Sequence, residues 1–197
     1  MKRVAAPAKK EAILAATRRL LIARGFQDLA LDEVARAAGV AKGTLFLYYR
    51  SKDALFSAAI GDLVDQLGRR LDELLASELR GRGLLAGTVR AILSHHDRNR
   101  DFMSHFGAGR FPACGARSAE RLMDKFRENG RRVARILRRC AENGLIPPGD
   151  FVYETAALFG LCRSAMLAKL MRGCDGSLAD QADKVLRFFL HGARGKA

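Results

Sequence analysis

Hydrophobic residues recur along the chain with the period of an α-helix. Near the N-terminus, Ile13, Ala16 and Leu20 have the spacing that places side chains on one helical face. Pro7 is favoured in the first turn of such a helix, and Gly25 accepts the left-handed conformation that commonly ends one. The alternation of polar and apolar residues that is typical of β-strands is almost absent. The pattern therefore predicts an all-α protein of about nine helices.

Two short helices are predicted next, separated by a tight turn. Leu31, Val34 and Ala38 lie on one face of the first, and Gly39 opens the turn before a second short helix at residues 42–49. Small residues beside the turn let the two helices approach closely. Such a pair is typical of a helix-turn-helix, in which the second helix enters the major groove of DNA. A core hairpin with a basic surface is the alternative.

Longer helices are predicted for the rest of the chain. One begins at Lys52, and the next follows a break at residues 81–83. Residues 107–115 contain three glycines and a proline, which predicts a loop or a broken helix. Further along, Asp150 is placed to cap a nearly all-apolar helix that Gly173 ends.

Charge adds a candidate partner to this pattern. The chain has 197 residues and a formal net charge of +14, and residues 1–52 alone hold 11 basic and 4 acidic side chains. A positive excess concentrated at the predicted helix-turn-helix favours a polyanion, nucleic acid before an anionic membrane surface.

The apolar stretches predict no membrane span. The longest candidate, at residues 151–171, is interrupted by Glu154, Arg163 and Lys169. The N-terminus lacks the apolar segment of a signal peptide. We therefore expect a cytoplasmic protein without a membrane partner.

The second short helix presents an unusual outward face. Leu45 and Tyr49 are four residues apart and are expected to point to the core, which leaves Thr44, Leu47 and Tyr48 facing outward. Hydroxyls and cations contact phosphates, and an exposed apolar side chain can lie against the methyl group of thymine. Exposing a leucine side chain to water is unfavourable, so an outward leucine at this position favours a DNA-binding role for this face.

The run GVAKGTLFLYYRSKDAL at residues 39–55 resembles the signature of the tetracycline-repressor (TetR) family. The resemblance implies a three-helix helix-turn-helix domain at residues 1–52, a linking fourth helix at residues 53–80, and an effector-binding and dimerisation domain at residues 81–197. The residues expected to contact DNA are Lys42, Gly43, Thr44, Phe46, Leu47, Tyr48, Arg50 and Lys52.

Three positions depart from the family's usual pattern. Ala30 and Ala41 stand where the family usually has a hydroxyl residue, which caps a helix or reaches a phosphate. Phe46 stands where the family commonly has tyrosine. The operator sequence of a relative therefore does not transfer to this chain.

The apolar helix after Asp150 needs two burial partners, because it is apolar on nearly all sides. A second subunit is the simplest second partner, joined by the last helix, which Ser177 is placed to cap. A central helix in a monomer is the alternative. The expected dimer-interface residues are Ala156, Gly160 and Phe189.

The family resemblance also implies a cavity for a small-molecule effector in the later helices. Aromatic and sulfur-containing side chains are its candidate lining, although ordinary core packing is the alternative. These candidates are Phe102, Met103, Phe106, Phe111, Phe126, Leu158, Cys162 and Met166.

No constellation typical of catalysis or metal binding emerges from the sequence. The four cysteines form no CxxC pair and are expected to be small buried hydrophobes. His95, His96 and His105 have no cysteine or carboxylate at ligand spacing. Arg131 and Arg135 share a helix face that is expected to be solvated. We therefore predict no enzyme, no metal and no cofactor.

Two functions remain. The first is a homodimeric transcriptional repressor that binds double-stranded DNA at a palindromic operator and is released by a small-molecule effector. The alternative is a helical small-molecule-binding or scaffold protein without specific operator binding. A specific duplex bound more tightly than random DNA separates the two.

Overall fold

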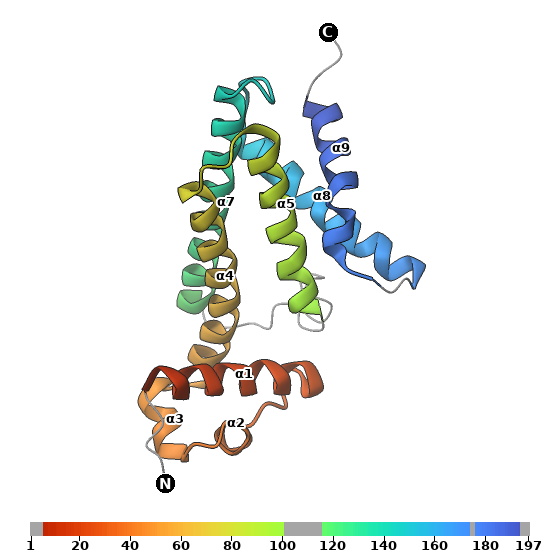
Figure 1. The fold of residues 1–197 in the computed structure, drawn as a ribbon. Coiled ribbons are helices and arrows are strands. Elements are labelled where there is room, and N and C mark those ends of the chain that lie inside the picture. The colour runs from red at the N-terminus through yellow and green to blue at the C-terminus, as the bar shows by residue number, and fades with distance from the viewer. Residues whose placement is uncertain (1–5, 101–115, 174–175, 194–197) are drawn as a thin grey trace. The chain divides into compact units, whose positions relative to one another are not determined.

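The computed structural model describes residues 6–100, 116–173 and 176–193. In these residues the chain is helical and contains no strand, which confirms the predicted all-α fold (Figure 1). The α-helices and the one 3-10 helix, η1, are α1 (Ala6–Arg24), α2 (Leu31–Ala37), α3 (Lys42–Tyr48), α4 (Lys52–Ala76), α5 (Gly81–Arg98), α7 (Ala116–Glu142), α8 (Phe151–Arg172), η1 (Leu178–Gln181) and α9 (Ala182–Ala193).

Glycines end several helices as the sequence predicts. Gly25 after α1, Gly39 after α2 and Gly173 after α8 have φ angles of 76°, 65° and 59°, in the left-handed region. A side chain with a Cβ atom rarely adopts this conformation, so glycine is the residue that suits these three positions.

The first compact unit contains residues 6–64 and 116–125. Its core is built from one face of each of its helices, with Ile13 of α1, Val34 of α2 and Leu45 of α3 fully buried. Phe56 of α4 is also fully buried. The rings of Phe26 and Phe56 form a T-shaped pair whose centroids lie 4.9 Å apart. This core holds α2 and α3 in place, since neither short helix would be stable alone.

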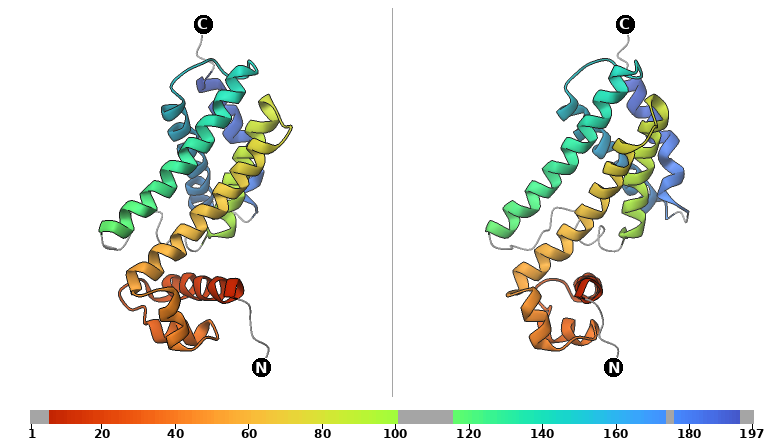
Figure 2. Two further views of the ribbon diagram at one scale, coloured as in Figure 1. Left: turned by 90° about the vertical axis from the view of Figure 1, so that its left-hand side faces the viewer. Right: turned by 60° about the vertical axis from the view of Figure 1, so that its left-hand side comes forward.

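The second compact unit contains residues 65–100, 126–173 and 176–193. Here α5 packs against α8, η1 and α9. The C-terminal parts of α4 and α7 lie alongside each other (Figure 2), joined by an ion pair of 2.8 Å between Arg132 and Asp72. The boundary between the two units therefore falls within α4 and within α7.

Asp97 connects three elements of the second unit. Its carboxylate accepts a 2.9 Å hydrogen bond from the Ser177 hydroxyl and a further one from the Leu178 amide, and Lys169 lies 3.6 Å away. Burial alone would raise the pKa of this carboxyl, but the hydrogen bonds and the lysine lower it below its usual value. The C-terminal end of α5 is thereby tied to α8 and η1.

Two helix boundaries differ from the prediction. Residues 81–83 were expected to break the chain, but α5 begins at Gly81, so the break lies before it. The last helix was expected to be continuous from Ser177. It begins instead as η1, whose capping box joins Ser177 and Asp180, and continues as α9.

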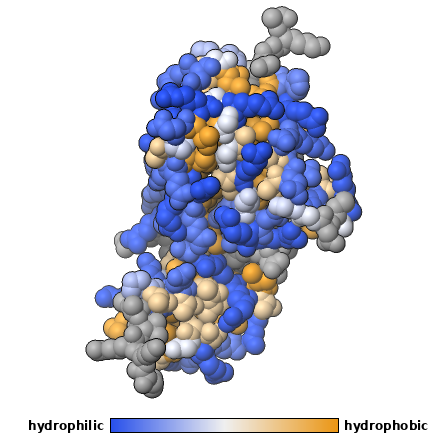
Figure 3. All heavy atoms as spheres, viewed as in Figure 1, coloured by the Kyte–Doolittle hydropathy of each residue, from blue (hydrophilic) through white to orange (hydrophobic). Residues whose placement is uncertain are grey.

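Hydrophilic residues cover most of the face of the second unit in Figure 3, and hydrophobic residues show between them. Of the described helices, α8 is long and apolar enough to cross a membrane by length and composition alone. This is weak evidence for a membrane span, because helices of soluble proteins also meet these criteria. Three of its side chains, Thr155, Leu158 and Cys162, are buried within the second unit.

Candidate nucleic-acid interface

The predicted helix-turn-helix is formed by α2, residues 38–41 and α3. Val40 donates a backbone hydrogen bond of 3.0 Å to the Ala35 carbonyl, which closes the turn. Ala35 and Leu45 are buried where the two helices meet. The small residues that the sequence places here therefore allow the close approach that it predicts.

The exposed face of α3 agrees only in part with the prediction, because Leu47 is exposed but Thr44 and Tyr48 are half-buried. Leu45 and Tyr49 are buried, whereas Leu47 is 86% exposed and Phe46 is 39% exposed. Gly43 is exposed and Thr44 is half-buried. An apolar side chain as open as Leu47 has no folding role that offsets its exposure to water.

Tyr48 differs from the expected outward position. It is half-buried and packs against the core of the first unit. Tyr48 stays a predicted DNA contact, with part of its ring used for packing.

The cations around α3 have contacts that the sequence did not reveal. Lys42 forms an exposed ion pair of 2.8 Å with Asp32 of α2. Lys52 donates a 2.7 Å hydrogen bond to the Gln27 carbonyl, and its ammonium lies 4.9 Å from the centre of the Phe26 ring. Lys52 therefore fastens the start of α4 to the segment before α2, and an ammonium still has donors for a phosphate.

Both short helices begin without a side-chain cap. Ala30 and Ala41 have the extended backbone of an N-cap residue, but an alanine side chain has no oxygen to accept from the first amides. Two acidic residues of α2 form exposed ion pairs, Glu33 with Arg24 at 2.7 Å and Asp32 with Lys42.

Only half of the candidate effector residues belong to the described part of the chain, and these four differ in their environments. Phe102, Met103, Phe106 and Phe111 are outside the described residues. Phe126 is 41% exposed, which is not the environment of an enclosed cavity. Leu158 and Cys162 are fully buried in the core of the second unit, and Met166 packs against that core.

The candidate dimer residues divide in a similar way. Ala156 and Gly160 are exposed on α8, as a contact with a second subunit requires. Phe189 is 4% exposed and belongs to the core of its own unit, whereas its neighbour Phe188 is 61% exposed. Because Phe189 is used in the core of its own unit, Phe188 is the side chain of the two that a second subunit could reach.

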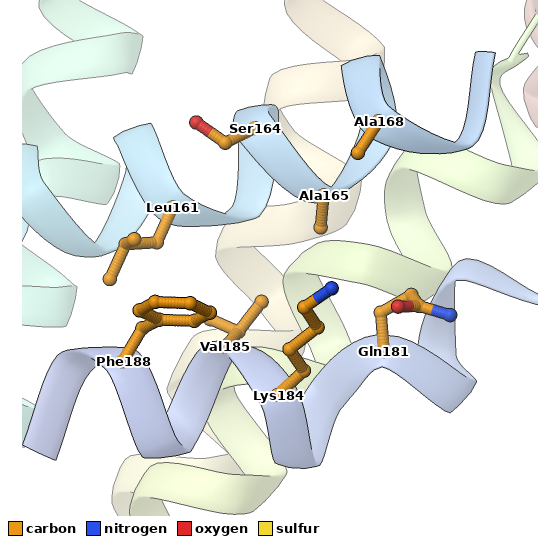
Figure 4. A pocket seen from close by; sticks show the side chains of 8 residues that line it. All are labelled: Leu161, Ser164, Ala165, Ala168, Gln181, Lys184, Val185 and Phe188. Carbon is orange, nitrogen blue, oxygen red and sulfur yellow. The ribbon is translucent and has the colours of Figure 1, made fainter. Parts of the chain in front are cut away.

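A groove of about 290 Å³ lies between α8 and α9 (Figure 4). The side chains of α8 face those of η1 and α9 across it, with Phe188 below Leu161 and Lys184 opposite Ala165. The lining residues are Leu161, Ser164, Ala165, Ala168, Gln181, Lys184, Val185 and Phe188.

The described cysteines and histidines do not form a metal site. Cys140 and Cys162 are free and buried, as predicted, and burial raises the pKa of their thiols to about 11 and about 12. Thiols with such pKa values are poor nucleophiles at neutral pH. Within the described ranges no group of three potential metal ligands occurs.

An all-helical chain with an exposed α3 face behind a tight turn is the architecture of a helix-turn-helix protein. Residues 13–59 match the family model of bacterial regulatory proteins, tetR family. Over these residues the chain is similar to the tetR family of bacterial regulatory proteins.

Similar proteins are transcriptional regulators. EthR of Mycolicibacterium smegmatis is 30% identical over 69 residues, which are 35% of this chain and 32% of EthR. RutR of Escherichia coli is 39% identical over 61 residues, which are 31% of this chain and 29% of RutR. The matched segments thus cover about a third of the length of these two relatives.

The likeness to solved structures extends over nearly the whole chain. The crystal structure of the transcriptional regulator FadR from Bacillus subtilis, in complex with stearoyl-CoA, superposes with a TM-score of 0.78 and 18% identity. The match covers 92% of this chain and 98% of FadR. At this level of identity the likeness shows a shared fold.

Proposed function

We propose that the chain is a homodimeric transcriptional repressor that binds a palindromic operator and is released from it by a small-molecule effector. The exposed apolar face of α3 carries this proposal, because Leu47 is open to solvent between Lys42 and Arg50. Cations contact the phosphate backbone and a leucine can contact thymine methyl groups, so this surface suits duplex DNA.

The exposed apolar side chains of α8 and α9 support a dimer of the second unit. A two-fold dimer would bring two recognition helices to the two halves of a palindrome. Charged residues at Gly160 or Phe188 should therefore break the dimer while the fold is retained. The exposed hydrophobic residues of α8 and α9 are Val152, Tyr153, Leu167, Leu170, Met171 and Phe188.

A long-chain acyl-CoA is the first effector class to test. It is suggested by the complex of the structurally similar FadR with stearoyl-CoA. An effector that releases DNA must bind the DNA-free protein more tightly by the same factor by which it weakens operator affinity. Calorimetry with stearoyl-CoA, with and without operator, measures this factor directly. Equal affinities in the two titrations would exclude release by this ligand class.

The decisive experiment is selection of genomic DNA fragments by the purified protein, followed by titrations of the selected duplex and of random DNA at several salt concentrations. Operator binding should exceed random binding by about a thousandfold or more. Equal affinity for both duplexes would leave the alternative, a helical ligand-binding protein without an operator.

Two variants of α3 sharpen this test. Leu47→Ala should mainly lower discrimination between operator and random DNA, by about 1–3 kcal/mol. Arg50→Ala, an exposed cation next to α3, should weaken binding to both duplexes and reduce the slope of affinity against salt by about one unit. Identical losses on both duplexes for both variants would contradict these separate roles.

A further inference from the structure

An ion pair joins the two helices of the candidate helix-turn-helix across the turn between them. The ammonium of Lys42, the first residue of α3, lies 2.8 Å from one carboxylate oxygen of Asp32 on α2 and 3.0 Å from the other. Both side chains are more than half exposed. Exposed ion pairs contribute little to stability, so the folding of these two short helices rests on their buried residues instead.

Lys42 is also poorly placed for the stability of α3. The first turn of this helix contains no acidic side chain, and Ala41 offers no capping oxygen. A cation at this end of a helix is repelled by the unpaired backbone amides, which carry partial positive charge. A lysine here therefore suits the binding of an anion better than it suits folding, and Asp32 supplies the negative charge beside it.

We propose that Asp32 is a positioning residue for DNA binding, which holds the Lys42 ammonium in one place beside α3. The inference rests on the DNA-binding function proposed above. An ammonium has three donors, of which the two carboxylate oxygens engage two, so one remains for a phosphate. In the operator complex Lys42 would then lie between Asp32 and a single backbone phosphate.

This arrangement would make a flexible cation contribute to discrimination between duplexes. A free lysine reaches phosphates on any sequence, because its side chain is long and mobile. A lysine that is already held loses less conformational entropy when a phosphate meets it in the right place. Where the phosphates lie elsewhere, as on random DNA, Lys42 has to leave Asp32 first. Asp32 should therefore lower affinity for random DNA while leaving operator affinity nearly unchanged.

The first test compares Asp32→Asn with Glu33→Gln. Glu33 is the matched control, because it is the next residue in the first turn of α2 and its ion pair, at 2.7 Å, is with Arg24 of α1. Each variant removes one negative charge and one ion pair. Asp32→Asn should lower discrimination between operator and random DNA about fivefold, the effect of ordering one long side chain. Its affinity for random DNA should depend more steeply on salt, by about one unit of slope. Glu33→Gln should change both affinities by the same factor.

The second test measures whether the effect of Asp32 passes through Lys42. In a Lys42→Met background, Asp32→Asn should change discrimination by less than about twofold. If Asp32 acted on the backbone of α3 instead, its effect would persist in this background. With Lys42 in place, Asp32→Glu keeps the charge and should retain most of the discrimination.

Undiminished discrimination in Asp32→Asn would overturn the proposal, as would an equal loss in Glu33→Gln or a loss that persists without Lys42. Melting temperatures check folding, and those of Asp32→Asn and Glu33→Gln should lie within about 4 °C of the wild type. A much lower value for Asp32→Asn alone would assign Asp32 to folding and would also overturn it. If the wild type itself binds no duplex selectively, the proposed function fails first, which distinguishes the two failures.

Discussion

In the first unit, α2 and α3 are seven residues long and begin at Ala30 and Ala41, which cannot cap them. In the second unit, α8 is 22 residues long and begins at Asp150, whose side chain accepts from two backbone amides. The short helices depend on packing against α1 and α4, whereas α8 also has local support. The shape of the candidate DNA-contacting surface therefore depends on packing against the rest of the first unit and not on side-chain caps of its own helices.

The largest expected effect separates two leucines of α3. Leu45→Ala should lower the free energy of unfolding by about 2–5 kcal/mol, because Leu45 is fully buried. Leu47→Ala removes the same atoms from an exposed position and should change stability by less than about 0.5 kcal/mol. Urea unfolding monitored by circular dichroism measures both. Similar losses for the two variants would mean that α3 is packed in a different register.

The next largest effect concerns acid stability and the buried His95 of the second unit. Burial lowers the pKa of His95 to about 4, with smaller contributions from the charges of His96 and Arg98. Between the unfolded value near 6.5 and about 4, the unfolded chain binds more protons than the folded one. The stability due to neutral His95 is therefore complete above this window and is lost as the pH falls through it.

A shift of this size corresponds to about 3 kcal/mol at most. Urea unfolding of the wild type and of His95→Gln at pH 7.5 and 4.5 checks it, and the variant should lose less stability on acidification. The variant should keep part of the dependence, because burial also lowers the pKa of His96. An equal loss in both proteins would show that His95 is not the buried neutral group.

Much of the first unit can be predicted from sequence because its determinants are local. The turn after α2 requires a left-handed residue, which Gly39 supplies, and the four-residue spacing of Leu45 and Tyr49 indicates which face of α3 is buried. The contact between Lys52 and the Gln27 carbonyl could not be predicted, since it joins residues 25 positions apart. The same holds for the ion pair of 2.8 Å between Arg18 of α1 and Asp62 of α4.

The second unit was less predictable because its helices are apolar on more than one side. Along α9, Phe189 shares the apolar spacing of Ala182 and Val185, but this spacing does not tell whether the side chain packs on its own unit or on a second subunit. The effector candidates share this difficulty. Leu158 and Cys162 satisfy the pattern of a cavity lining and that of a packed core equally well, and the structure places them in the core.

A change in stability of intermediate size is expected to distinguish alanine substitutions at two glycines of α4 that lie in different units. A Cβ atom at Gly68 would lie 2.8 Å from Oδ1 of the buried Asn129, which also accepts from Arg132. At Gly61 it would lie 3.3 Å from the flexible stem of Lys125. Alanine favours the helix by about 1 kcal/mol at both positions.

Gly68→Ala should nevertheless destabilise the protein by about 1 kcal/mol, since overpacking costs about 1–3 kcal/mol. Gly61→Ala should be neutral or stabilising, because the lysine can move. Thermal unfolding of the two variants distinguishes them. A stabilised Gly68→Ala would show that α4 and α7 have room to separate.

The smallest expected effect tests the contrast in capping. Asp150 accepts hydrogen bonds of 3.0 and 3.2 Å from the amides of Val152 and Tyr153, so Asp150→Ala should cost about 1 kcal/mol. Ala30→Ser should have the opposite sign and gain up to about 1 kcal/mol. Ala30 is exposed and has φ −97° and ψ 131°, a backbone in which a serine hydroxyl can reach the first amides of α2.

Hydrogen exchange of the α2 and α8 amides locates each change within the chain. If Ala30→Ser slows exchange in α2 but leaves α3 unchanged, the two short helices open independently. Slower exchange in both would show that the helix-turn-helix opens as one unit, and that a single added cap stiffens the whole candidate DNA-binding surface.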